Sequence, residues 1–186
     1  MNVKSNIVAI VGMPGSGKST AANFFKKKGI PILRFGDQTD IGLKELTKSL
    51  TEVNESWYRK KIRQELGMAA MAIKIEPRIN AIKKNNALIV LDGLYSWEEY
   101  LYLIEKFSDL QLLCIYTRSE IRYGRLGRRQ IRPLTIAEAR QRDFHEIEDT
   151  NKGGPIAIAD YLIKNEGSEV EFIQELEIYF KYYHAH

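Results

Sequence analysis

The stretch Gly12-Met13-Pro14-Gly15-Ser16-Gly17-Lys18-Ser19 matches the pattern G-x-x-x-x-G-K-[ST] at every position. It follows an apolar run, residues 7–11, that has the length and composition of a buried strand. Glycines let the backbone turn tightly and direct its N–H groups inward, and a helix that starts at the same place adds its positive N-terminus. The stretch therefore predicts a loop that binds phosphate groups, and the alternative is a glycine-rich turn without a ligand.

The expected ligand of this loop is ATP with Mg²⁺. Lys18 is expected to reach the β- and γ-phosphates, and the Ser19 hydroxyl is expected to bind the metal. The nucleotide-binding residues predicted here are Gly12, Met13, Pro14, Gly15, Ser16, Gly17, Lys18, Ser19 and Thr20.

Length and composition are those of one ordinary domain, residues 1–186. The chain is 44% hydrophobic and 28% charged, with no low-complexity tract or internal repeat. The first apolar run is about five residues long, too short for a secretory signal or a membrane span. The single cysteine, Cys114, lies in an apolar run and has no internal disulfide partner. A reducing compartment is expected for such a thiol, and the predicted location is the cytoplasm.

Positive charge is concentrated in one segment rather than spread over the chain. The formal net charge is +4, and arginines cluster between Arg118 and Arg142. Such a segment, about residues 122–142, is predicted to form a lid over a bound triphosphate, with Arg125, Arg129 and Arg132 neutralising the γ-phosphoryl group. Alternatives are a solvated basic helix and an RNA-binding stripe. The lack of aromatic residues from 125 to 142 argues against nucleic acid.

Strand and helix patterns alternate along the chain, which predicts an α/β fold of the P-loop NTPase type. The expected sheet has five parallel strands, with helices on both faces. Strands are predicted near 6–11, 31–35, 87–91, 110–116 and 160–164. Helices are predicted near 18–28, 41–50, 56–84, 96–106, 118–127, 135–149 and 168–182. The helical segment at about 41–86 is expected to bind a phosphoryl acceptor, or else to be a packing hairpin.

Two aspartates follow predicted strands at the edge where ligands bind in open α/β sheets. Asp92, before Gly93, is in a Walker B-like position and is expected to orient Mg²⁺. Its alternative role is to cap the helix near residue 96. Asp37, after Phe35-Gly36, is expected to position or deprotonate an acceptor hydroxyl, or else to cap a helix.

With these residues in hand, the chain resembles dephospho-CoA kinases and, at its start, adenylate-kinase-related proteins. The resemblance covers nearly the whole chain. The quoted loop and Phe35-Gly36-Asp37 are similar to the nucleotide loop and the second-strand ending of the related group. Residues 159–168, Ala-Asp-Tyr-Leu-Ile-Lys-Asn-Glu-Gly-Ser, resemble the ending A-D-x-x-I-x-N-x-G of dephospho-CoA kinases. The resemblance implies that Asn165 and Gly167 lie beside the adenine of ATP.

The resemblance to these kinases extends to the lid. The chain differs from nucleoside monophosphate kinases where those enzymes bind the acceptor. Arg125-Leu126, Leu134-Thr135, Glu138-Ala139 and Arg142 look like the lid and following helix of those kinases. Nucleoside monophosphate kinases usually place arginines where this chain has residues 41–43 and 94–95. Those arginines usually hold the phosphate of the acceptor. Arg63 resembles a position in the related group and would partly replace them, or else form a surface salt bridge.

Together these features predict an ATP-dependent phosphotransferase that acts on a nucleotide-like small molecule. The expected acceptor is dephospho-CoA, with a nucleoside monophosphate second, bound by Asp37, Arg63, Asp92 and Arg142. The alternative is an ATPase or regulatory module that binds ATP on a kinase fold. The sequence does not predict an oligomeric state.

Overall fold

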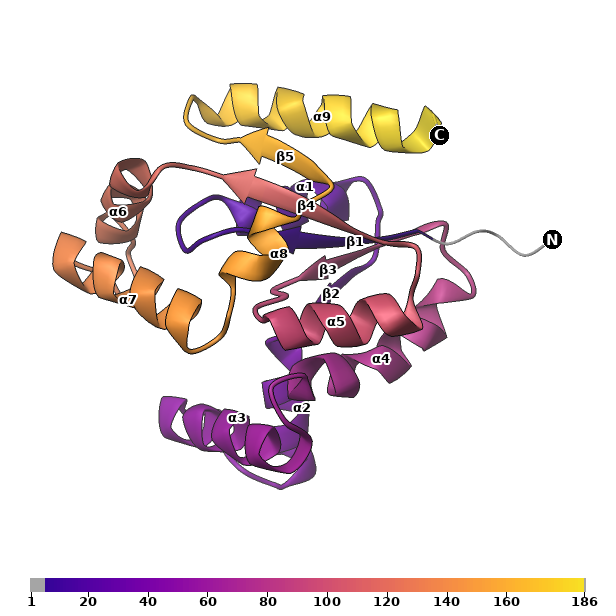
Figure 1. Cartoon of the computed structure of the whole chain (residues 1–186), viewed down its shortest axis with the longest axis vertical. Coiled ribbons are helices and arrows are strands. Elements are labelled where there is room, and N and C mark those ends of the chain that lie inside the picture. Colours follow the sequence, from indigo (N-terminus) through magenta and orange to yellow (C-terminus); the bar gives the residue numbers. More distant parts are fainter. Residues whose placement is uncertain (1–5, 186) are drawn as a thin grey trace.

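Five parallel strands form the centre of the molecule, in the order β2-β3-β1-β4-β5 (Figure 1). The computed structural model describes residues 6–185, so residues 1–5 and 186 of the expected domain lie outside the described residues. The strands are β1 (Asn6–Val11), β2 (Ile32–Arg34), β3 (Leu88–Asp92), β4 (Leu110–Tyr116) and β5 (Tyr161–Lys164). The predicted fold class is confirmed.

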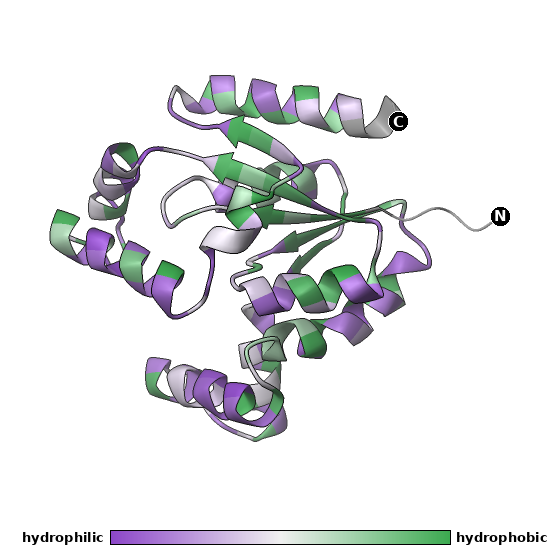
Figure 2. Cartoon of the chain, in the orientation of Figure 1, coloured by the Kyte–Doolittle hydropathy of each residue, from purple (hydrophilic) through white to green (hydrophobic). Residues whose placement is uncertain are grey.

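The central strand, β1, is apolar because both of its faces are covered. Ile7 pairs in register with Ile89 of β3 and with Leu110 of β4, and every pairing in the sheet is parallel. The carboxyl ends of all five strands therefore point to one edge. Figure 2 shows the hydrophobic colour concentrated in the strands, while the helices alternate between hydrophobic and hydrophilic residues, as a parallel sheet with covered faces requires.

Helices cover the two faces and surround the ligand edge. One core cluster joins the sheet to α2, α3, α4 and α5 through residues such as Leu43, Tyr58, Ile75 and Leu103. The other joins it to α1 and α9. The helices are α1 (Lys18–Lys27), α2 (Asp37–Glu45), α3 (Glu52–Leu66), α4 (Ala70–Lys83), α5 (Trp97–Lys106), α6 (Ser119–Gly127), α7 (Ile136–Glu148), α8 (Gly153–Ala157) and α9 (Glu169–Ala185). Within residues 6–185, no helix combines the length and apolarity that crossing a bilayer requires.

Two helix predictions need correction, and one helix was missed. The helix expected at 41–50 begins earlier, at Asp37, directly after β2. The long helix expected at 56–84 is two helices, because the chain turns at Gly67, which has a φ of 77°, a conformation that favours glycine. The short helix α8 was not predicted at all.

Candidate functional site

The loop from Gly12 to Gly17 connects β1 to α1 and packs tightly against neighbouring strands. Gly12, Gly15 and Gly17 have φ values of 142°, 80° and 108°, which L side chains rarely adopt. A Cβ on Gly12 would lie 2.4 Å from the carbonyl oxygen of Ile115, and one on Gly17 would lie 2.2 Å from Nδ2 of Asn165. Glycine is therefore required at these positions by conformation and by space.

Ser16, inside this loop, has a buried hydroxyl with no hydrogen-bond partner among the described residues. Its carbonyl oxygen accepts hydrogen bonds from Thr117 Oγ1 at 3.1 Å and from Asn165 Nδ2 at 2.7 Å. Thr117 and Asn165 thus hold the backbone of the loop, while the Ser16 hydroxyl is left unpaired. An orphaned hydroxyl in a glycine cradle at a helix N-terminus fits a phosphate ligand, so these residues suit ATP.

Lys18 lies against the loop that it follows. Its Nζ donates to the carbonyl oxygens of Gly12 at 2.8 Å and Met13 at 3.1 Å. Burial, reinforced by the nearby positive charge of Lys152, lowers the pKa of Lys18 to about 7. An anion at this place would favour the charged form of the amine.

A cavity of about 310 Å³ opens in front of the loop. Its walls come from the loop, the end of β3, the lid and the segment that follows α7. The cavity is lined by Pro14, Gly15, Gly17, Lys18, Ser19, Thr20, Arg34, Asp92, Tyr95, Arg125, Arg129, Arg142, Glu146 and Lys152. We call it the phosphate cavity.

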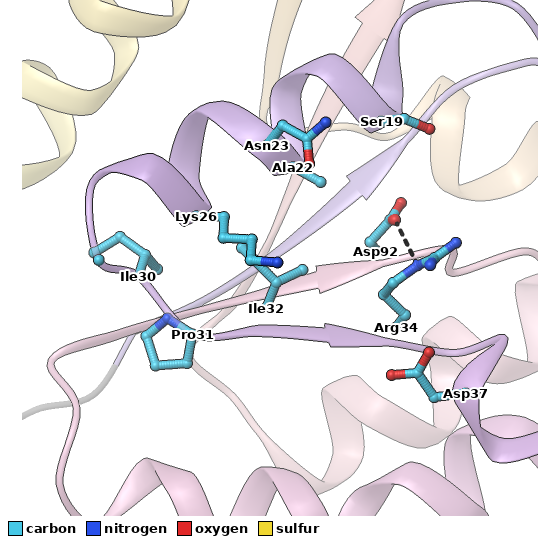
Figure 3. A pocket seen from close by; sticks show the side chains of 11 residues that line it. Ser19, Ala22, Asn23, Lys26, Ile30, Pro31, Ile32, Arg34, Asp37 and Asp92 are labelled. Carbon is cyan, nitrogen blue, oxygen red and sulfur yellow. Dashed lines mark ion pairs between the residues drawn. The ribbon is translucent and has the colours of Figure 1, made fainter. Parts of the chain in front are cut away.

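Ser19 and Asp92, the predicted metal-binding residues, line the phosphate cavity together. They also line an adjoining hollow of about 700 Å³ between α1 and β2, which Figure 3 shows with Arg34 and Asp37. Arg34 Nε lies 3.5 Å from Asp92 Oδ2, the dashed line of Figure 3. One hydroxyl, one carboxylate and nucleotide phosphates form the oxygen-rich set that Mg²⁺ prefers, so the residues present fit this metal.

A second cavity, of about 610 Å³, lies between the lid and the helical segment of α2, α3 and α4, which we call the insert. Arg34, Tyr95, Arg142 and Glu146 line both this cavity and the phosphate cavity. The two therefore form one continuous cleft. The remaining residues of the second cavity, which we call the acceptor cavity, are Phe35, Gly36, Asp37, Thr39, Asp40, Glu55, Arg59, Arg63, Met71, Glu99, His145 and Thr150.

The structure places three of the predicted acceptor residues, Asp37, Arg63 and Arg142, on the wall of the acceptor cavity. Asp37 is the first residue of α2, after the N-cap Gly36, and its carboxylate lies 3.6 Å from Arg78 Nη2. The Nε of Arg63 is buried without a hydrogen-bond partner. The fourth predicted residue, Asp92, lies in the phosphate cavity and lines the adjoining hollow of Figure 3 rather than the acceptor cavity.

The lid arginines separate into two groups. Arg125 and Arg129 line the phosphate cavity. Arg125 donates to Thr117 Oγ1 at 3.4 Å and to Asn165 Oδ1 at 3.3 Å, and burial lowers the pKa of its guanidinium. Arg132 instead lies in the lid turn, exposed, and pairs with Glu52 of α3 at 3.1 Å. Arg132 does not line the phosphate cavity, and its role at the γ-phosphoryl group stays a prediction.

Asn165 and Gly167 follow β5 at the same edge of the sheet. Asn165 is buried and bonds to the loop at Ser16, and it accepts from Arg125. A Cβ on Gly167 would lie 2.2 Å from Glu171 Oε2. This turn thus borders the phosphate-binding loop, and its place beside adenine stays a prediction.

Two buried ion pairs with clear structural roles in the site were not predicted. Arg122 is buried, forms two hydrogen bonds to Asp143 at 2.9 and 2.7 Å, and donates to the Pro14 carbonyl at 3.1 Å. Lys152 is only 2% exposed and forms an ion pair with Glu146. Nothing in the local sequence marks Lys152, because Asn151-Lys152-Gly153-Gly154 has the composition of a surface turn.

Solved structures with the same overall fold include kinases. The chain superimposes on TT1252 from Thermus thermophilus with a TM-score of 0.66 at 16% identity, covering 95% of this chain and 97% of the other. A shikimate kinase from Aquifex aeolicus gives 0.56 at 20% identity, covering 94% and 96%. A gluconokinase from Sinorhizobium meliloti gives 0.53 at 15% identity, covering 97% and 99%. At these identities the likeness shows the fold, that of P-loop kinases.

Sequence comparison identifies the family. An AAA domain family matches residues 8–150. A UPF0200 protein from Pyrococcus abyssi is 32% identical over 180 residues, which cover 92% of this chain and 94% of that protein. One from Thermococcus kodakarensis is 32% identical over 175 residues, with coverage of 92% and 94%. These relatives do not specify dephospho-CoA as an acceptor. The chain carries the AAA domain of P-loop proteins and belongs to the UPF0200 family.

Proposed function

We propose that the protein is an ATP-dependent phosphotransferase that acts on a small anionic molecule. The observation that carries this proposal is the continuous cleft. A phosphate-binding loop lines one end, arginines and acidic side chains line the other, and Arg34, Tyr95, Arg142 and Glu146 line both. Phosphoryl transfer needs mainly the alignment of donor and acceptor and positive charge around the transferred group, which Lys18 and the arginines of this cleft would supply.

The nucleotide end would hold ATP on residues 12–20. Ser19 and Asp92 would bind Mg²⁺, which neutralises phosphate charge. Lys18, Arg125 and Arg129 would surround the terminal phosphates, since all three line the phosphate cavity. Asn165 and Gly167 would border the adenine, as the resemblance to dephospho-CoA kinases implies.

The acceptor end favours an anionic molecule of nucleotide-like size. Basic and acidic side chains both line the acceptor cavity, namely Arg34, Arg59, Arg63 and Arg142 with Asp37, Asp40, Glu55, Glu99 and Glu146. Among the arginines, Arg63 has a buried Nε without a hydrogen-bond partner among the described residues, which suits an anionic ligand. Guanidinium groups bind phosphate and carboxylate with matching geometry, and about 610 Å³ is within the usual range for small-molecule sites. Dephospho-CoA and a nucleoside monophosphate are the two acceptors that we propose for testing, in that order.

Asp37 would position the acceptor or accept its proton. It lines both the acceptor cavity and the hollow beside Ser19 and Asp92. A general base must lie within hydrogen-bond reach of the proton that it takes, and Asp37 is the aspartate at the carboxyl end of β2 that faces both spaces. Buried Cys114 is compatible with the cytoplasm, the location that we propose.

ADP production from ATP·Mg²⁺ tests the proposal. Wild type and Lys18→Ala are compared with dephospho-CoA, each nucleoside monophosphate, each deoxynucleotide and no acceptor. A phosphotransferase requires one acceptor to raise turnover far above the control and Lys18→Ala to abolish it. ATP hydrolysis that is the same with every acceptor would instead identify an ATPase or a regulatory module.

A further inference from the structure

Lys152 is a buried cation at the wall of the phosphate cavity. It directly precedes α8, and its side chain is 2% exposed. Its backbone N–H donates to the Glu146 carbonyl oxygen at 3.2 Å, and its Nζ lies 4.5 Å from the centre of the Tyr95 ring. Both the backbone and the side chain of Lys152 therefore have partners, and the residue lines the same cavity as the phosphate-binding loop.

Glu146 is shared between two cations. One carboxylate oxygen accepts from Arg142 Nε at 3.1 Å, and the other pairs with Lys152. A single carboxylate cannot neutralise both, and Lys18 adds a further positive charge to the same cavity. Burial is the main cause that lowers the pKa of both lysines, and Lys152 lowers that of Lys18 further while Arg142 lowers that of Lys152 further. These groups repel one another, which a bound anion would relieve.

The other acidic groups of the neighbourhood are already engaged. Asp92 lies beside Arg34, and Asp143 bonds to Arg122. Glu99 accepts the backbone N–H groups of Tyr95 and Ser96, and burial raises its pKa to about 7. The excess of positive charge is therefore a property of the whole cluster.

The lid supplies fewer cations than the sequence suggests, since Arg132 pairs with Glu52 of the insert. We propose that Lys152 binds the γ-phosphate of ATP together with Lys18, and that Glu146 positions its ammonium group. This inference rests on the proposed nucleotide binding. It assigns a phosphate contact to the segment between α7 and α8, which joins the lid to the sheet.

Calorimetric titration with ATP·Mg²⁺ and ADP·Mg²⁺ tests the assignment, because only ATP carries a γ-phosphate. Lys152→Met should weaken ATP binding about tenfold, as expected for one charged hydrogen bond. ADP affinity should change less than about twofold, within the spread of surface substitutions. Lys152→Arg should retain most of the preference for ATP. Lys84→Met, an exposed change at the end of α4, is the matched control.

Equal losses for ATP and ADP in Lys152→Met, or no loss for either, would overturn the assignment. Because removal of Lys152 leaves Glu146 with one partner, the double variant Glu146→Gln/Lys152→Gln keeps a neutral hydrogen-bonded pair should the single variant fail to fold. The acceptor panel is measured on the wild type separately. If no acceptor stimulates turnover, the phosphotransferase proposal fails, while the comparison of ATP with ADP still decides the role of Lys152.

Discussion

Lys18 carries two opposing requirements. Binding phosphate requires a charged ammonium group, yet burial and the proximity of Lys152 lower its pKa to about 7. The free energy that opposes the charge in the ligand-free protein is recovered when an anion binds. At this position a lower free energy of unfolding accompanies a higher affinity for an anion, a pattern common at functional sites.

Lys18→Met should therefore stabilise the ligand-free protein. The folded pKa of Lys18, about 7, lies below the ordinary value of 10.5, so the unfolded chain binds more protons between these values and wild-type stability rises with pH there. The penalty is fully present below pH 7. We expect Lys18→Met to gain about 1 kcal/mol near pH 7, or about 2–4 °C in Tm, since two hydrogen bonds are also lost.

Thermal melts from pH 6 to pH 10 check this expectation, and the gain should shrink as the pH rises. Lys84→Met, in the exposed C-cap of α4, should follow the wild-type pH profile. Parallel profiles for wild type and Lys18→Met would show that Lys18 carries no such penalty.

Asp92 gives a prediction about metal dependence. Asp92→Asn keeps the shape of the side chain and removes the charge that Mg²⁺ prefers. Titration of ATP binding with Mg²⁺ should show the half-saturating metal concentration raised about 10- to 100-fold. Asp109→Asn, whose carboxylate pairs with Lys83 at 2.9 Å, is the matched control. An unchanged metal requirement in Asp92→Asn would exclude Asp92 from the metal site.

At the scale of elements, the α6 and α7 helices are joined by one buried ion pair. Arg122 and Asp143 are each less than one tenth exposed, and Tyr123 adds a hydrogen bond to Asp143 at 2.9 Å. Arg122 also donates to the carbonyl oxygens of Thr117 and Pro14. The base of the lid is thereby fixed to the phosphate-binding loop.

Arg122→Met should destabilise the protein by about 3–5 kcal/mol, because Asp143 would remain buried and charged without its main partner. Urea unfolding at pH 7 measures the loss. The double variant Arg122→Met/Asp143→Leu should recover much of it, since no unpaired charge remains. A loss below about 1 kcal/mol in Arg122→Met would place this pair with the weak surface pairs.

Local signals predicted some elements better than others. The loop and β1 were predicted because their glycines and apolar residues are contiguous in sequence. The boundary between α3 and α4 was missed because Gly67 is a single glycine within a long helical pattern, and such a glycine is often tolerated. The capping pairs Ser96–Glu99 and Ser168–Glu171 are local signals too, since each spans three residues, and both are present in the structure.

Long-range pairs account for the parts of the site that the sequence did not predict. Arg132 was expected at the phosphates, but its partner is Glu52, which lies on another element. Lys152 and Lys18 are far apart in sequence and line one cavity because the segment after α7 returns to the sheet edge. The sequence shows that these residues are charged, but it does not show which residue each of them contacts in the fold.

At the scale of the whole molecule, the parallel sheet brings the loop, the β3 end, the lid and the insert to one edge. Figure 1 shows α6 and α7 on one side of this edge and α2 and α3 below it. Across the cleft, the exposed pair between Arg132 and Glu52 joins the lid to the insert. Exposed pairs contribute little to stability, so the ligand itself should be the main connection.

Ligand binding should therefore stabilise the whole chain through mass action. With ATP·Mg²⁺ at 100 times its dissociation constant, the wild type should gain about 2.7 kcal/mol, which corresponds to about 5–11 °C in Tm for a chain of this size. Differential scanning fluorimetry over a series of ATP concentrations measures the shift. Lys18→Ala, which lacks the cation at the loop, should show at most a small shift at the same concentration. A wild-type Tm that does not change with ATP would contradict nucleotide binding at this cleft, and an equal shift in Lys18→Ala would place the nucleotide elsewhere on the molecule.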